Sequence, residues 1–236
     1  MAKQLADGRW WEEEFDLSAL TYAQFLAFFF DRPIVADKEK YELFRSGIDY
    51  FVASNPTVIV AHVQAMCRGF LELTQVYSHE QLDQGLWAVF GSGISCEQYL
   101  FDSTLDLGLR TGCIESMYVP FKDVVAQSNI DKRGSFYWMW WDMILHTFWH
   151  IYYSTDDNYQ RLSADGKQMC DAMYQTLLKI LVLDYPACQW SALHGLGHLS
   201  HPQVRETVQA FLDVHRSELN DDDLEWVQAC RDGKIA

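Results

Sequence analysis

The chain has 236 residues, of which 49% are hydrophobic, 22% are charged and 15% are aromatic, and its formal net charge is −15. A chain of this length buries roughly 70% of its unfolded surface on folding, so neither a metal ion nor a disulfide is needed to hold its core together. The negative charge argues against nucleic acid and against an anionic membrane as partners, because both attract clustered cations. A protein partner would be basic or would be bound through an apolar patch.

The six cysteines are scattered, with no C-x-x-C pair among them. The chain also has no apolar run after a basic start, the pattern typical of a secretion signal. We therefore expect reduced, mostly buried cysteines in a cytoplasmic protein.

Signals for helix starts recur along the chain, whereas strand signals are few. Asn55-Pro56 combines a preferred N-cap residue with proline at the first helical position. Ser78 with Gln81, and Ser95 with Gln98, fit the capping box in which the two side chains bond each other's backbone N–H groups. Asn220 precedes three aspartates and predicts the start of a final helix.

Apolar residues between these signals recur at spacings of three and four, which is typical of helices packed on one face. We expect an all-α protein of antiparallel helix pairs, forming either an α-solenoid or an irregular multi-helix bundle. Residues 1–236 are expected to form one domain, with a candidate internal boundary at 128–133. The predicted helices cover residues 17–30, 38–53, 56–76, 80–90, 96–107, 112–125 (interrupted at Pro120), 134–153, 165–182, 186–199, 202–215 and 221–231.

The segment 135–153, SFYWMWWDMILHTFWHIYY, has about the length of a bilayer span. Asp142, His146 and His150 interrupt its centre, where charged groups are costly in a membrane. The aromatic residues also occur throughout the segment and do not form belts at its two ends. We interpret it as a buried core helix.

The stretch 188–213, CQWSALHGLGHLSHPQVRETVQAFLD, contains two amphipathic segments joined by a tight turn at 200–202. Gly195 and Gly197 weaken the first helix intrinsically, so we expect close backbone packing there as compensation. This pattern, within residues 186–215, resembles a HEAT-type helical repeat. The resemblance covers about a fifth of the chain and implies stacked helix pairs with a concave binding surface.

Two histidine pairs are candidates for chemistry. His146 and His150 follow Asp142 at intervals of four, so all three project from one helical face, and His194 and His198 have the same spacing. Together they could hold zinc or iron, with Asp142 as a ligand or as a partner that orients His146. Alternatively, each set is the polar edge of a buried helix and no cofactor is bound.

The sequence is compatible with two functions. The first is a non-enzymatic protein–protein interaction module of scaffold or immunity type, and it is favoured because no phosphate-binding loop or nucleophile motif is present. The second is a metal-dependent helical enzyme or metal-binding protein that uses the two H-x-x-x-H pairs. The second hypothesis requires the helix that begins near Gly134 to pack beside the one that begins near Pro186.

Overall fold

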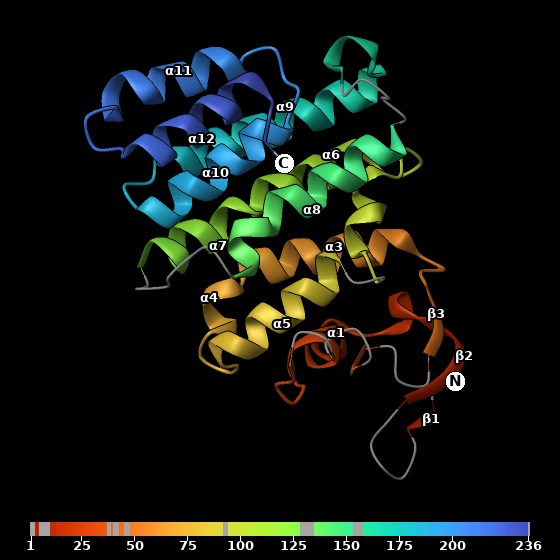
Figure 1. Cartoon of the computed structure of the whole chain (residues 1–236). Coiled ribbons are helices and arrows are strands. Elements are labelled where there is room, and N and C mark those ends of the chain that lie inside the picture. The colour runs from red at the N-terminus through yellow and green to blue at the C-terminus, as the bar shows by residue number, and fades with distance from the viewer. Residues whose placement is uncertain are drawn as a thin grey trace.

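The computed structural model describes residues 3–4, 10–36, 39, 43–44, 48–91, 94–127, 135–152 and 158–235. These residues form a mainly α-helical protein, as predicted, with a small sheet near the N-terminus (Figure 1). The α-helices are α1 (Tyr22–Phe30), α3 (Pro56–Arg68), α4 (Phe70–Leu73), α5 (His79–Phe90), α6 (Leu107–Ser116), α7 (Tyr118–Asp123), α8 (Phe136–Ile151), α9 (Ala164–Leu181), α10 (Pro186–His198), α11 (Val204–His215) and α12 (Asp221–Asp232).

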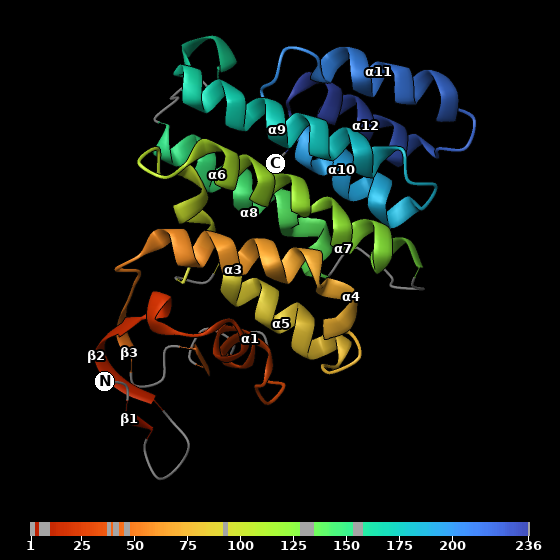
Figure 2. The same cartoon turned by 180° about the vertical axis from the view of Figure 1, so that it is seen from behind.

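The longer helices from α3 onwards stack in two layers. One layer contains α3, α6, α9 and α11, and the other contains α5, α8, α10 and α12 (Figures 1 and 2). The chain crosses from one layer to the other at each connection and so advances from the N-terminal end of the stack to the C-terminal end. This arrangement agrees with the expected stacking of antiparallel helix pairs.

Side-chain contacts fix the direction of the helices. Within the pair α11–α12, Arg205 bonds Asp232 and Gln209 bonds Arg231, so the two helices are antiparallel. Neighbouring helices of the same layer run in parallel. For example, Trp138 of α8 contacts His194 of α10, and one turn later on both helices Asp142 contacts His198. Parallel direction matters for the site because equal spacings on two such helices come into register.

The N-terminal sheet corrects one prediction. Its strands are β1 (Lys3–Gln4), β2 (Trp10–Asp16) and β3 (Ile48–Val52), in the order β1-β2-β3, and β2 pairs with β3 in parallel, with Phe15 opposite Phe51. The helix expected over 38–53 is therefore wrong at its C-terminal end. The segment is extended because it pairs with β2 along its length, from Ile48 opposite Glu12 to Val52 opposite Asp16.

Several helix boundaries also differ from the predictions: for example, α1 begins at Tyr22 and α6 at Leu107, not at residues 17 and 112. The expected helix 56–76 divides at Gly69 into α3 and α4, and residues 96–107 contain the 3₁₀ helix Cys96–Phe101. The predicted capping box at Ser95 is wrong, because Ser95 has a left-handed φ of 50° and its side chain caps nothing. Pro120 lies inside the first turn of α7, where a missing N–H is tolerated, and the break comes earlier, at Met117.

Other local predictions are confirmed. Ser78 and Gln81 form a capping box, and the Asn220 side chain caps α12 by accepting the N–H of Asp223. Thr21 and Gln24 form a second capping box at the start of α1, which was not predicted. The candidate internal boundary at 128–133 lies outside the described residues.

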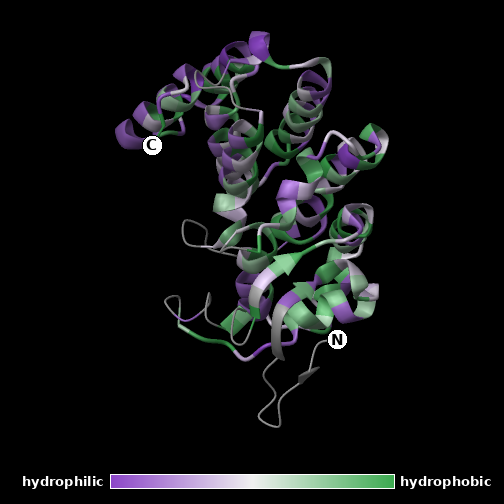
Figure 3. Ribbon diagram, turned by 90° about the vertical axis from the view of Figure 1, so that its right-hand side faces the viewer, coloured by the Kyte–Doolittle hydropathy of each residue, from purple (hydrophilic) through white to green (hydrophobic). Residues whose placement is uncertain are grey.

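The core is continuous from the sheet to α12, and all six cysteines are buried and unpaired. α8 lies in the middle of the stack with Trp140 and Trp141 fully buried, as expected for a core helix. Polar residues are more frequent towards the C-terminal end of the molecule (Figure 3). No helix in the described part of the chain combines the length and apolar character that a membrane span requires.

One buried ion pair joins α6 to α9. The Arg110 guanidinium, 1% exposed, donates through both terminal nitrogens to the Asp165 carboxylate, which also accepts the hydroxyl of Tyr152. These bonds from Arg110 are the main reason that the pKa of Asp165 lies below its ordinary value. A bidentate pair of this kind fixes the relative position of the two helices.

Candidate metal centre

α8 carries the first half of the site on its polar face. The helix begins at Phe136, whose backbone N–H donates to the Asp83 carboxylate of α5 at 2.6 Å, so a neighbouring helix caps it. Its aromatic and aliphatic residues point into the core, which leaves Asp142, His146 and His150 together on the remaining side. Their spacing of four places them in a row along the helix axis.

α10 carries the second half, and two glycines bring it close to its neighbours. A methyl group on Gly195 would lie 2.7 Å from atoms of Trp141 and Leu177, and one on Gly197 would lie 2.5 Å from Ile235. Both distances are shorter than a carbon–carbon contact allows, so alanine at either position would force neighbouring atoms to move. The close packing expected from the glycine pair is thus present, and it brings the backbone of α10 against α8.

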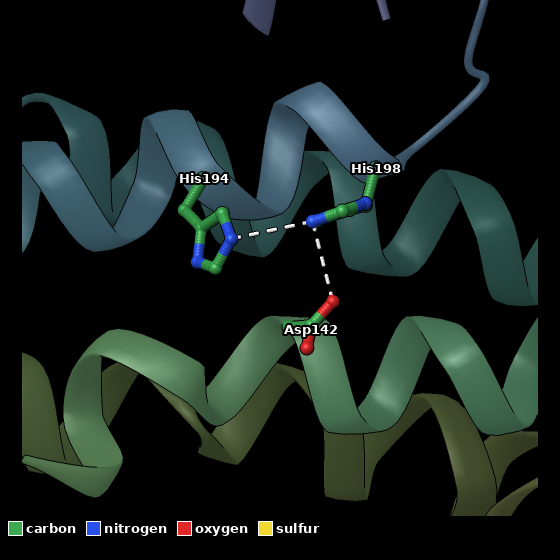
Figure 4. Close-up of side chains that lie close together, drawn as sticks. All are labelled: Asp142, His194 and His198. Carbon is green, nitrogen blue, oxygen red and sulfur yellow. Dashed lines mark hydrogen bonds and ion pairs between the residues drawn. The ribbon is translucent and has the colours of Figure 1, made fainter. Parts of the chain in front are cut away.

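The structure brings Asp142, His194 and His198 together (Figure 4). The Nε2 atom of His198 lies 3.2 Å from the Asp142 carboxylate oxygen Oδ1 and 3.2 Å from the Nε2 atom of His194. One potential ligand atom from each residue lies within 4.8 Å of the other two. His194 is 5% exposed, while the side chains of Asp142 and His198 are about a quarter exposed, so the cluster opens to one side.

The ring of His194 is held in a defined orientation. Its Nδ1 atom lies 3.1 Å from the backbone carbonyl of Trp138, which can only accept a hydrogen bond. The Nδ1 atom therefore carries the proton, and the lone pair of Nε2 points towards His198. The indole of Trp138 stacks on the same imidazole, with 4.7 Å between ring centroids and 18° between planes, and Trp226 of α12 packs against Trp138.

Two further bonds join α8 to α10 on either side of the cluster. The Ser191 hydroxyl donates to the carbonyl of Tyr137 at 2.7 Å, and the indole N–H of Trp149 donates to the carbonyl of His198 at 3.1 Å. Together with the His194 bond, they fix the axial register of the two parallel helices. A site whose supporting residues are fixed in this way is preorganised for a ligand.

A pocket of about 390 Å³ adjoins the cluster. It shares Asp142 and His198 with the cluster and has His146 and His150 on its wall, whereas His194 does not line it. His146 and His150 are exposed and are outside the group of three close ligand atoms. The full lining consists of Asp142, Leu145, His146, Trp149, His150 and His198.

Leu145, Ser191 and the carbonyl of Trp138 also belong to the site or support it, and the predicted site residues do not include them. Leu145 could have been found, since it lies three residues after Asp142 and therefore on the same helical face. Ser191 and the Trp138 carbonyl depend on the register between α8 and α10, which no local pattern reveals.

The other polar clusters near these helices have structural explanations. His201 lies 3.2 Å from the Asp171 carboxylate and stacks on Tyr174, and burial lowers the pKa of its imidazole. Glu97 accepts a hydrogen bond from Thr147 of α8 and is almost fully buried. Neither cluster combines three metal-ligating side chains.

Searches of protein-family models, curated proteins and solved structures found no match to this chain.

Proposed function

We propose that this protein binds a divalent transition-metal ion, zinc or ferrous iron, through Asp142, His194 and His198. The observation that carries the proposal is the convergence of three ligand atoms from two parallel helices that are joined by hydrogen bonds. Imidazole and carboxylate together suit both ions.

Two of the three distances between ligand atoms match those of a tetrahedral metal site. Bonds of about 2.0–2.1 Å in a tetrahedral site place neighbouring ligand atoms about 3.3–3.4 Å apart. The two measured separations from His198 Nε2 are both 3.2 Å. The ligand atoms of the remaining pair, His194 and Asp142, lie within 4.8 Å of each other, so binding of a shared ion requires these two side chains to move closer together.

The tautomer of His194 supports the same function. Metal-ligating histidines usually donate their second ring N–H to a carbonyl or carboxylate, which orients the ring and raises its basicity. The bond from His194 Nδ1 to the Trp138 carbonyl supplies this arrangement.

Three protein ligands leave at least one coordination position for water or a substrate. Catalytic zinc sites, and iron sites with two histidines and one carboxylate, share this open arrangement, whereas structural zinc sites have four protein ligands. The adjoining pocket gives the open position access to a small molecule. The function supported best is therefore that of a metal centre acting as a Lewis acid on a small ligand.

The alternative of a protein–protein interaction module stays a prediction. Among the described residues, six large hydrophobic side chains are exposed, on several elements of the fold. They are Ile34, Tyr50, Leu71, Val76, Val182 and Val214.

The direct test is zinc titration of the untagged, demetallated protein in competition with a chelator, combined with elemental analysis of the protein as purified. We expect one ion per chain. Separate variants Asp142→Asn and His198→Asn are expected to lower the affinity more than about 100-fold, beyond the 10–100-fold typical of residues that only support a ligand. His215→Asn on α11 is the matched control and should bind like the wild type. Absence of stoichiometric metal binding in the folded wild type would refute the proposal.

A further inference from the structure

The wall of the pocket beyond the metal ligands combines hydrogen-bond donors with apolar surface. His146 and His150 lie one and two turns after Asp142 on α8, and Leu145 and Trp149 alternate with them on the same face. The pocket volume of about 390 Å³ is in the lower part of the range of about 300–1,000 Å³ that holds small organic ligands. The metal cluster uses neither His146 nor His150.

The charges in the pocket favour an anionic ligand once a divalent ion is bound. Asp142 is the single carboxylate among the six lining residues, so ion and carboxylate together carry one net positive charge. The imidazoles of His146 and His150 add N–H donors near the mouth. The overall charge of −15 acts over longer distances, where salt screens it beyond about 8 Å.

We propose that the pocket binds a small organic anion whose carboxylate or phosphate head occupies the open metal position and accepts a hydrogen bond from His146 or His150. The apolar body of the ligand packs against Leu145 and Trp149. This inference rests on the proposed metal site and names the class of ligand for it.

The arrangement distinguishes anions from neutral molecules of the same shape. A neutral amide reaches the metal through a carbonyl oxygen but leaves the net positive charge of the centre uncompensated. Hydrogen bonds to charged groups contribute about 1.5–3 kcal/mol, or roughly tenfold or more in affinity. The apolar wall favours ligands with a hydrocarbon body over inorganic anions.

The test is calorimetric titration of the zinc-loaded wild-type chain with benzoate, phenyl phosphate and benzamide. We expect benzoate or phenyl phosphate to bind at least about tenfold tighter than benzamide, and the comparison between the two anions identifies the preferred head group. The double variant His146→Asn/His150→Asn should keep one zinc per chain and bind the preferred anion about tenfold or more weakly. The control His215→Asn should leave the affinities for both zinc and the anion unchanged.

The outcomes separate this inference from the proposed function. If the wild type does not bind zinc, both proposals fail. If zinc binds but benzamide binds as tightly as both anions, the metal site stands and the ligand class is wrong. Loss of zinc from the double variant would make His146 or His150 a metal ligand, and this too would overturn the inference.

Discussion

Glu97 provides a quantitative test of the buried environment beside α8. Its side chain is 2% exposed, one carboxyl oxygen accepts a hydrogen bond of 3.0 Å from Thr147, and the other has no hydrogen-bond partner. Burial raises the pKa of Glu97 from the ordinary 4.5 to about 8, so the folded protein holds this carboxyl protonated at neutral pH.

A raised pKa in the folded state means that the folded protein binds the proton more tightly than the unfolded chain does. The resulting stabilisation is fully present below pH 4.5 and is lost as the pH rises towards 8. At 1.36 kcal/mol per pKa unit, the stabilisation from this group falls by about 3 kcal/mol between pH 5 and pH 7.5. For a chain of this length that loss corresponds to about 6–12 °C in Tm.

Glu97→Gln replaces the carboxyl with an amide that is neutral at every pH and can still accept the Thr147 hydroxyl. Thermal unfolding of wild type and variant at pH 5 and pH 7.5 measures the effect. We expect the difference in Tm between variant and wild type to be about 6–12 °C larger, in favour of the variant, at pH 7.5 than at pH 5. Glu206→Gln, an exposed substitution on α11, controls for the loss of a carboxylate. Equal pH dependence in wild type and Glu97→Gln would refute the reasoning.

Three further perturbations test the packing and the site. Gly195→Ala places a methyl group 2.7 Å from Trp141 and should lower the free energy of unfolding by about 1–3 kcal/mol in urea titrations. Gly69→Ala is the control: the atom nearest to its methyl group is 3.4 Å away, so the free energy of unfolding should change little. Arg110→Met removes one partner of the ion pair between α6 and α9 and should lower the free energy of unfolding by about 2–4 kcal/mol in the same assay. The loss is smaller than for a fully buried pair because the Asp165 side chain is about a quarter exposed. Zinc at about 100 times its Kd should raise the Tm of the wild type by about 5–11 °C, from a stabilisation of about 2.7 kcal/mol, and should not raise that of His198→Asn. An unchanged stability in either packing variant, or an equal zinc response in His198→Asn, would contradict the corresponding argument.

Much of the helical fold could be predicted because its signals are local. The Ser78 capping box, the Asn220 cap and the three-and-four spacing of apolar residues each act within one or two turns. The strand Ile48–Val52 could not be predicted in this way, because it is stabilised by pairing with β2, more than thirty residues earlier. The local pattern at Ser95 is also misleading: this residue has a positive φ, and the expected side-chain cap is not formed.

The candidate site is likewise predictable only where it depends on local spacing. Helical spacing alone groups Asp142 with His146 and His150, and groups His194 with His198. The sequence does not reveal that α8 and α10 run in parallel with Asp142 level with His198, since that register depends on packing around Gly195 and on bonds between the helices. It also does not show which histidines converge with Asp142.

The most direct test of the metal centre is a crystal structure of the zinc-loaded protein with diffraction data collected on both sides of the zinc absorption edge. The geometry predicts one anomalous peak between α8 and α10, about 2.0–2.2 Å from the Nε2 atoms of His194 and His198 and from the Asp142 carboxylate. A peak on His146 and His150 away from these atoms, or no peak in a folded chain saturated with zinc, would contradict the account.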